Sequence, residues 1–207
     1  MTETDFTIFL VDDDAGVLKA ISRLLRTRGY TTLAFTSPRE FLETHDSSIP
    51  GCALLDVSMP DHDGLELQQA LIAERPVIFL TGEGDIPTSV RAMKAGAIDF
   101  LTKPVCEADL FAAIARAIQV DSNTRCASCE LRSINDRVAS LTPREQEVMT
   151  HVIAGRLNKQ IAGDLGTVEK TIKVHRGRVM QKMGVRSVAD LVRLAEKAGI
   201  SPRSAAR

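Results

Sequence analysis

The chain has 207 residues, 44% hydrophobic and 26% charged, a balance typical of a folded protein with one large domain or two small ones. No apolar run approaches the length of about 18 residues that a membrane-spanning helix needs. The first residues are acidic and lack the basic region of a secretory signal. We therefore expect a cytoplasmic protein without a membrane partner. Residues 1–120 carry a net charge of −8 and residues 121–207 one of +7, which predicts a cation as ligand of the first part and a polyanion as ligand of the second.

The first 120 residues alternate short apolar runs with helical patterns. Five such pairs joined by short connections predict a parallel sheet with helices on both faces. In such sheets the reactive crevice lies beyond the carboxyl ends of the strands. We expect strands over 6–11, 31–35, 52–56, 77–81 and 98–101, and helices over 17–28, 38–43, 65–73, 87–95 and 108–120.

Residues 121–139 form a polar stretch without proline or glycine. Leu131, Ile134, Val138 and Leu141 recur in it at helical spacing, which predicts a helical linker. This apolar stripe either packs on a neighbouring domain or forms a dimer seam, and both interpretations stay open.

From residue 140 onward the pattern is wholly helical. The segment Thr142-Pro143-Arg144-Glu145 is a capping box with proline at the first helical position. Helices are expected from Pro143 to a stop at Gly155, and over 158–165, 169–183 and 187–198. Four short helices with a tight turn between the second and the third predict a helix-turn-helix domain over 140–207.

Acidic and basic side chains follow the expected strands of the first part. Asp12–Asp14 follow one strand, Asp56 ends another, and Thr81 and Lys103 come at the ends of the last two. Converging carboxylates need a cation among them, and hard oxygen ligands suit Mg²⁺ or Mn²⁺. A carboxylate nucleophile, a divalent metal, a lysine and a hydroxyl are the groups that transfer and hold a phosphoryl group.

The motifs that carry these groups resemble the receiver domain of two-component response regulators. They are VDD at 11–13, LDVSMPDHDG at 55–64, TG at 81–82 and KP at 103–104. The stretch TGEGDIP at 81–87, together with AMKAGAIDFL at 92–101, is especially similar to the FixJ branch of that family. The resemblance covers about residues 5–120 and implies a flavodoxin-like (βα)5 receiver with a parallel five-stranded sheet.

The resemblance also implies roles for individual residues. Asp56 would be the phosphoacceptor, and Asp12 and Asp13 would hold the metal together with Asp56 and the backbone carbonyl of Ser58. A further set would sense and bind the phosphoryl group: Thr81 and Phe100 as the switch pair and Lys103 as the phosphate-binding lysine.

Three positions depart from the family pattern. Glu83 replaces a more familiar histidine, and we expect its carboxylate near the phosphoryl entrance to tune the lifetime of the acyl phosphate. The segment 70–76 looks short before the fourth strand, which would shift the preceding helix. Val105 stands where phenylalanine is usual, a change expected to affect packing only.

The C-terminal motifs resemble the LuxR/NarL-type helix-turn-helix. They are LTPRE at 141–145, Gly155, NKQIA at 158–162 and TIKVH at 171–175, and the resemblance covers about residues 138–200. It makes Lys173, Val174 and Arg176 the best candidates for the major groove. Lys159 and Arg178 are expected to grip DNA phosphates.

Two features of this domain concern the recognition helix and dimerisation. Val168 stands at a usual cap position but has no side-chain acceptor, so Thr167 is expected to cap the recognition helix instead. Val188, Leu191 and Val192 are predicted to form a small apolar dimerisation surface. A two-fold dimer reads paired half-sites, which predicts a palindromic operator.

The four cysteines are too few for a disulfide framework in a cytosolic chain. Cys126 and Cys129 form a CxxC motif without a second pair at zinc spacing. We interpret them as plain linker cysteines, with redox sensing as the alternative.

Together these features predict a transcriptional response regulator and not an enzyme acting on an external substrate. Its expected partners are a sensor histidine kinase, promoter DNA, a second copy of the chain after phosphorylation, and RNA polymerase. Two alternatives remain at this stage. The first is a flavodoxin-like flavin enzyme, which would have the same sheet but needs a phosphate-cradling Gly/Ser/Thr loop after the first strand, and this sequence lacks that loop. The second is a DNA-binding protein whose receiver no longer needs phosphate, so that its DNA affinity would not depend on Asp56.

Overall fold

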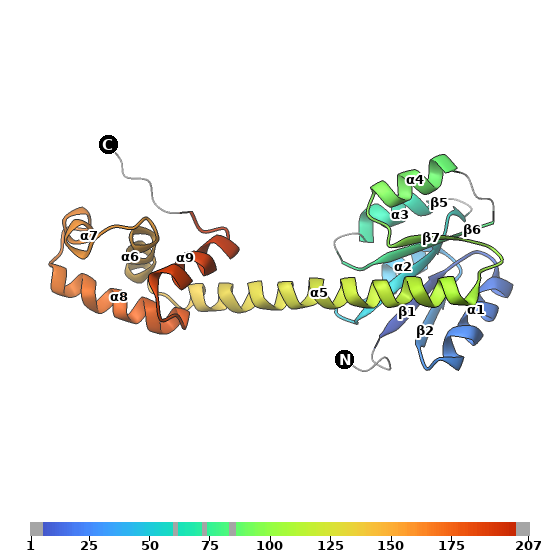
Figure 1. Cartoon of the computed structure of the whole chain (residues 1–207), viewed down its shortest axis with the longest axis horizontal. Coiled ribbons are helices and arrows are strands. Elements are labelled where there is room, and N and C mark those ends of the chain that lie inside the picture. Colours follow the sequence, from blue (N-terminus) through green and yellow to red (C-terminus); the bar gives the residue numbers. More distant parts are fainter. Residues whose placement is uncertain (1–5, 60–61, 72–73, 83–85, 202–207) are drawn as a thin grey trace. The chain divides into compact units, whose positions relative to one another are not determined.

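The computed structural model describes residues 6–59, 62–71, 74–82 and 86–201, and the chain divides into two compact units, Met1–Arg125 and Cys126–Arg207 (Figure 1). Each unit has a hydrophobic core of its own. Among the described residues, no helix is both long and apolar enough to span a membrane.

The N-terminal unit is built around a parallel five-stranded sheet with the order β2-β1-β3-β6-β7. Its strands are β1 (Thr7–Val11), β2 (Thr31–Phe35), β3 (Gly51–Asp56), β6 (Val77–Thr81) and β7 (Asp99–Thr102). The strands β1, β3 and β6 are buried along their whole length, which explains why their sequences are continuous apolar runs and do not alternate. The expected sheet is confirmed, with strand ends within one residue of prediction.

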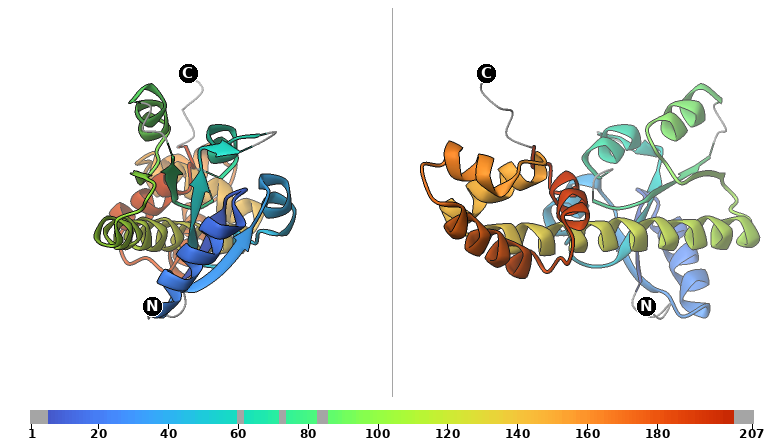
Figure 2. Two further views of the ribbon diagram at one scale, coloured as in Figure 1. Left: turned by 90° about the vertical axis from the view of Figure 1, so that its right-hand side faces the viewer. Right: turned by 60° about the vertical axis from the view of Figure 1, so that its left-hand side comes forward.

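Helices cover both faces of this sheet (Figures 1 and 2). Helix α1 (Ala15–Thr27) and the first part of α5 (Glu107–Ala139) pack on one face, where Leu25 and Ile114 are fully buried. Helices α2 (Pro38–Thr44), α3 (Gly64–Leu71) and α4 (Ile86–Lys94) lie on the other, where Phe41 and Leu71 are fully buried.

A short antiparallel pair, β4 (Ser58–Met59) and β5 (His62–Asp63), follows the end of β3. The sequence analysis did not predict it. It leads into α3 at Gly64, where an added Cβ would lie only 2.6 Å from the carbonyl oxygen of Asp56 and 3.3 Å from the ring of Phe79. Only glycine lets the start of α3 approach the carboxyl end of β3 this closely.

Helix α5 runs without interruption from Glu107 to Ala139. The predicted helix over 108–120 and the helical linker over 121–139 are therefore one element, and the expected end at residue 120 is wrong. The physical reason is that nothing stops the helix, because no proline or glycine occurs between Pro104 and Pro143. Ile134 and Leu141 are buried in the core of the C-terminal unit and Val138 packs against it, so this part of the stripe packs on its own neighbouring domain, whereas Leu131 is 40% exposed.

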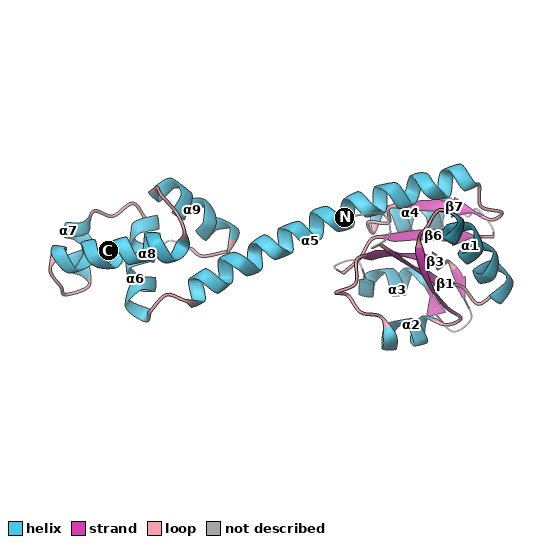
Figure 3. Cartoon of the chain, turned by 90° about the horizontal axis from the view of Figure 1, so that it is seen from below, coloured by secondary structure: helices cyan, strands magenta, loops and turns pink. Residues whose placement is uncertain are grey.

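The C-terminal unit is helical throughout its described part (Figure 3). After the end of α5 come α6 (Pro143–Ile153), α7 (Asn158–Asp164), α8 (Glu169–Met183) and α9 (Val188–Lys197). The predicted capping box is present, because Thr142 Oγ1 accepts from Glu145 N and a Glu145 carboxylate oxygen accepts from Thr142 N. Gly184 ends α8 in the left-handed region at φ 66°, a conformation that favours glycine.

The start of α8 has no side-chain cap. Its N-cap residue is Val168, whose side chain is 65% exposed and accepts no hydrogen bond. Thr167 lies one residue outside the cap, with its backbone N–H bonded to the carbonyl of Ala162, so its expected capping role is wrong. The helix itself begins at Glu169, as predicted.

Replacing Val168 with serine should stabilise the C-terminal unit by about 1 kcal/mol, because a serine hydroxyl accepts a hydrogen bond from the first turn. For a unit of this size the midpoint of thermal unfolding should rise by roughly 4–8 °C. Calorimetry of the full chain measures this shift. Val168→Ala is the matched control, since it removes the same apolar surface without adding an acceptor, and equal midpoints for the two variants would contradict the prediction.

Candidate functional site

Four of the predicted pocket residues meet at the carboxyl edge of the N-terminal sheet. Asp12 directly follows β1, Asp56 ends the neighbouring β3, Thr81 ends β6, and Lys103 directly follows β7. The strands β1 and β3 are adjacent in the sheet, and the chain turns to opposite sides of the sheet from this point. This is the switch point at which parallel sheets place their ligands.

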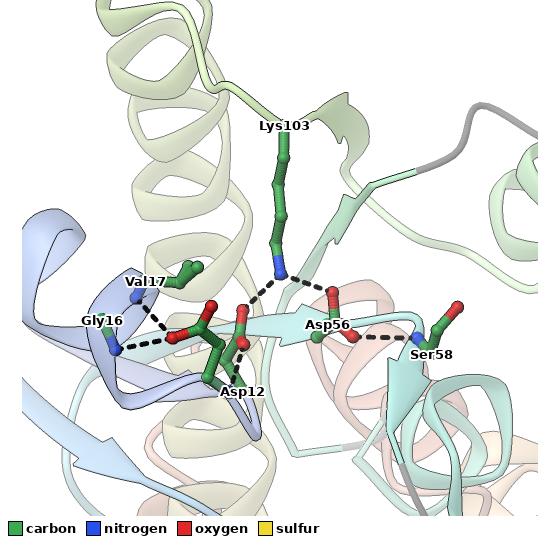
Figure 4. A network of polar contacts seen from close by, with 7 residues as sticks. Asp12, Gly16, Val17, Asp56, Ser58 and Lys103 are labelled. Carbon is green, nitrogen blue, oxygen red and sulfur yellow. Dashed lines mark hydrogen bonds and ion pairs between the residues drawn. The ribbon is translucent and has the colours of Figure 1, made fainter.

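Lys103 bridges the two buried carboxylates of this pocket (Figure 4). Its Nζ donates to Asp12 Oδ2 at 2.6 Å and to Asp56 Oδ1 at 2.7 Å. Asp12 and Asp56 are only 2% and 5% exposed. The remaining Asp56 oxygen, Oδ2, accepts from the backbone N–H of Ser58 at 3.0 Å, so both oxygens of this carboxylate are oriented.

The pocket holds Lys103 in its charged form. Burial by itself lowers the pKa of Lys103, but the hydrogen bonds and charges of Asp12 and Asp56 outweigh it, and the net pKa lies above its usual value. The ammonium group is therefore a fixed positive charge near neutral pH. An incoming phosphoryl group would meet this charge beside the Asp56 carboxylate.

The three consecutive aspartates after β1 have different surroundings. Asp12 points into the pocket, and its Oδ1 accepts from Asp14 N at 2.9 Å. Asp13 is exposed. Asp14 caps α1, with its Oδ1 accepting from Gly16 N and Val17 N.

The donor chemistry of the pocket suits a hard divalent cation. The ammonium of Lys103 lies within hydrogen-bond distance of both Asp12 and Asp56, which shows that a cation is accommodated between these carboxylates. Within the described residues, no three His, Cys, Asp or Glu side chains are grouped closely enough to hold a metal ion by side chains alone, and Asp13 is exposed. The predicted ligands share one edge of the sheet, where Lys103 joins Asp12 to Asp56 and the backbone N–H of Ser58 bonds to Asp56.

The predicted switch pair lies on the two strands beside the pocket. Thr81 is 3% exposed, and its carbonyl accepts from the backbone N–H of Lys103 at 2.7 Å. Phe100 is half-buried in β7, with its ring centroid 6.1 Å from that of Phe79. The backbone that carries the lysine is therefore bonded directly to the residue expected to sense the phosphate.

Two of the sequence departures fall partly or wholly outside the described residues. Glu83 is one of these, and its expected place near the phosphoryl entrance stays a prediction. In the short segment before β6, residues 72–73 are likewise not described. Val105 packs against the core of the sheet face that α1 and α5 cover, in agreement with its expected packing role.

The C-terminal unit exposes basic side chains on α7 and α8. Lys159, Lys173 and Arg178 are exposed, and Val174 is 49% exposed next to Lys173. Ile172, Val179 and Met183 form the opposite face of α8 and are fully buried. Helix α8 thus has one face in the core and one face available to a polyanion.

Two basic residues of α8 are partly engaged within the unit. Arg176 is half-buried, and its Nη1 donates to Asn158 Oδ1 at 3.1 Å. Lys182 donates to the Ser140 carbonyl at 2.9 Å and forms an ion pair with the buried Glu145 at 2.7 Å. Lys182 therefore joins α8 to the start of α6, where its partner is the glutamate of the capping box.

The Glu145 pair predicts an acid-sensitive C-terminal unit. The hydrogen bond from Lys182, followed by that from the Thr142 backbone, lowers the pKa of Glu145 from 4.5 to about 2. A depressed folded-state pKa contributes stability above the unfolded value and loses it as the pH falls toward the folded value. Between pH 4.5 and about 2 the stability of this unit should therefore decline.

Denaturant unfolding of the full chain at a series of pH values measures this decline. Glu145→Gln should flatten the acid limb for the C-terminal transition. Glu147→Gln is the control, because Glu147 is 42% exposed in its pair with Arg144. The same acid limb in both variants would show that Glu145 is not its source.

The predicted dimerisation surface needs one correction. Leu191 is fully buried in the core of the C-terminal unit and offers no surface to a partner. The physical reason is that the apolar stripe of α9 faces α6, which leaves Val188 and Val192 half-buried. For these two residues, dimerisation stays a prediction.

A lysine-bridged carboxylate pocket at the carboxyl edge of a parallel five-stranded sheet, followed by a basic helix-turn-helix unit, defines a DNA-binding response regulator. Residues 8–115 match the family described as "Response regulator receiver domain". Residues 139–195 match "Bacterial regulatory proteins, luxR family". The chain belongs to the two-component response regulators with a LuxR-type DNA-binding domain, which are transcriptional regulators and not catalytic enzymes.

Relatives align along nearly the whole chain. Nodulation protein W of Bradyrhizobium diazoefficiens is 42% identical, with 96% of this chain and 88% of the relative covered. Response regulator protein TodT of Pseudomonas putida is also 42% identical, with 95% and 88% covered. The solved structure of the response regulator StyR has a TM-score of 0.81 at 45% identity, covering 93% of this chain and 99% of that one. Full-length FixJ from B. japonicum has a TM-score of 0.54 at 39% identity, covering 94% and 97%.

Proposed function

We propose that this regulator is switched on by phosphorylation of Asp56 in its receiver, residues 1–120, and that the signal passes through the linker, 121–139, to the DNA-binding domain, 140–207. The observation that carries the proposal is the Lys103 bridge. It places a fixed ammonium beside a buried carboxylate at the edge of the sheet where ligands bind. Family membership implies that the phosphoryl group comes from a cognate sensor histidine kinase.

In the proposed reaction an oxygen of Asp56 attacks phosphorus, so that an O–P bond forms and the bond from phosphorus to the kinase histidine breaks. The histidine nitrogen leaves with the bonding electron pair. Receiver domains generally use Mg²⁺ for this step. Asp12, Asp13, Asp56 and the Ser58 carbonyl would hold the ion, which supplies charge neutralisation when bound. Lys103 pairs with the developing phosphoryl charge.

The phosphoryl group adds negative charge and three acceptor oxygens beside Asp56. We expect the Thr81 hydroxyl to bond to one of these oxygens and Phe100 to turn inward behind it, which would alter the neighbouring face of α4. Through the linker this change would favour a homodimer that binds a palindromic promoter site with Lys173, Val174 and Arg176. RNA polymerase would then be recruited to that promoter.

The direct test measures DNA binding and oligomer mass of the full chain in the same buffer containing Mg²⁺, with and without a small acyl phosphate donor. We expect the donor to increase the mass from monomer to dimer and to produce a symmetric footprint. Equal DNA affinity in both conditions would favour a DNA-binding protein whose receiver no longer needs phosphate.

A further inference from the structure

The first turns of the C-terminal unit, which belong to α5, carry a pair of exposed thiols. Arg125 is the last residue of the N-terminal unit, and the next buried residue along the helix is Ile134, in the core of the C-terminal unit. Every residue over 126–133 is exposed. Cys126 and Cys129 lie in this segment as free cysteines.

The helix before this segment is firmly held. Arg125 donates to the carbonyls of Ser47, Ser48 and Ile49 at 2.7–2.9 Å, and its Nε contacts both carboxylate oxygens of the buried Asp121. Beyond Arg125, the described residues show one side-chain hydrogen bond or ion pair from 126–133 to another element, from Glu130 to Lys197, and both side chains are more than half exposed. Such a pair contributes little stability.

Tertiary contacts therefore contribute little to the stability of the helix over 126–133. Most helix stability in proteins comes from packing of one face, and no residue over 126–133 is packed in a core. The sequence at 126–129 is Cys-Ala-Ser-Cys, in which three of four residues have below-average helix propensity. No core packing therefore opposes a strain placed on this turn.

A disulfide between the two cysteines would supply such a strain. Residues three apart lie on the same side of a helix with their Cβ atoms about 5–6 Å apart. A disulfide needs a Cβ separation of about 3.5–4.5 Å. Reduced cysteines fit the helix, whereas the bridged pair requires the turn between them to deform.

The other two cysteines lack this combination. Cys52 is fully buried in β3, and burial raises the pKa of its thiol to about 12, which keeps it protonated and unreactive. Cys106 is exposed but has no cysteine three or four residues away. The chain thus contains one pair of exposed cysteines three residues apart, and two other cysteines that serve as controls.

We propose that Cys126 and Cys129 form a redox modification site, a dithiol that a disulfide oxidant such as glutathione disulfide converts to an intramolecular disulfide that unwinds α5 within 126–133. The thiolate of one cysteine attacks a sulfur of the oxidant and releases one glutathione thiolate. The second cysteine then displaces the other glutathione from the mixed disulfide. Two protein thiols are oxidised, one glutathione disulfide is reduced to two glutathione thiols, and the thiol protons pass to the released thiolates.

Limited proteolysis of the full chain tests the structural step. Trypsin cleaves after arginine, and Arg132 is exposed in the segment next to Cys129. After incubation with glutathione disulfide, the Cys106→Ser chain, whose exposed cysteines are Cys126 and Cys129, should lose two hydrogens in mass without gaining glutathione. Cleavage after Arg132 should become about tenfold faster, because trypsin needs the locally opened chain. Reduction with dithiothreitol should restore both the mass and the slow cleavage.

Matched variants separate the disulfide from other thiol chemistry. The wild-type chain should form the same internal bridge and show the same faster cleavage, with one further glutathione on the exposed Cys106. In the Cys106→Ser background, Cys129→Ser should gain one glutathione at Cys126 and still be cleaved slowly, since a single modified thiol does not strain the turn. A disulfide-linked dimer, a glutathione adduct in place of the internal bridge, or an internal bridge with unchanged cleavage would each overturn the proposal.

The regulatory consequence rests on the proposed function, because it assumes that phosphorylation acts through α5. In the oxidised chain the phosphodonor should still label Asp56 but should no longer increase DNA affinity. If the reduced chain also fails to respond to the donor, the proposed function fails. If the reduced chain responds and the oxidised chain responds equally, only the redox inference fails.

Discussion

Replacing Asp56 with asparagine should reduce labelling by a radioactive acyl phosphate donor to background and remove the donor-dependent increase in DNA affinity. Asparagine keeps the shape of the side chain but offers an amide in place of a nucleophilic carboxylate. Phosphoprotein labelling and DNA titration of the full chain measure the two effects. The variant should stay folded, because the Lys103 ammonium keeps Asp12 as its partner at 2.6 Å.

The control for this prediction is Asp12→Asn. The geometry alone does not choose between the two carboxylates, because both are buried and both contact Lys103. We expect Asp12→Asn to lower the labelling rate through weaker metal binding but to leave a covalent label on Asp56. A label that persists in Asp56→Asn and disappears in Asp12→Asn would assign the phosphoacceptor to Asp12.

Replacing Lys173 with alanine should weaken binding to the cognate operator by on the order of tenfold or more and relax its sequence preference. A lysine at a base edge contributes about 1–3 kcal/mol of discrimination, and Lys173 is exposed on the outer face of α8. Titration of the phosphorylated full chain on the operator and on a scrambled site of equal length measures both quantities. The ratio of the two affinities should fall.

Lys159→Ala and Arg193→Ala complete this comparison. Lys159 is exposed at the start of α7, and its loss should weaken binding to both DNA sites equally and reduce the salt slope by about 1. Arg193 lies on α9 with its side chain 77% exposed, and its loss should change neither affinity. An unchanged affinity ratio in Lys173→Ala would remove this residue from the groove.

Most of the fold could be predicted because the local sequence patterns indicate the same strands and helices that the packing of the core requires. The strands β1, β3 and β6 are buried on both faces, and a continuous apolar run indicates such a strand directly. The capping box at Thr142 and the left-handed Gly184 similarly begin and end helices by local chemistry. The hairpin of β4 and β5 escaped prediction because each strand has only two residues, too few for any periodicity.

For the candidate site, the sequence predicted which residues lie near one another but not which of them are in contact. Parallel strands bring their carboxyl ends to one edge, so the convergence of Asp12, Asp56 and Lys103 followed from the expected topology. Which carboxylates Lys103 would bridge did not follow, and neither did the exposure of Asp13 beside the buried Asp12. These depend on distances between atoms far apart in the chain.

The sequence by itself determined the two-part organisation, the parallel sheet, the pocket at Asp56 and the basic recognition helix, because each depends on spacing along the chain. Only the tertiary structure decided that Leu191 and Lys182 serve the core of the C-terminal unit, since burial and ion pairing depend on which helix face meets another. It also showed α5 as one continuous helix in which Cys126 and Cys129 are exposed. The sequence indicates which residues form a helix, but only the tertiary structure shows which of its turns are stabilised by packing against a core.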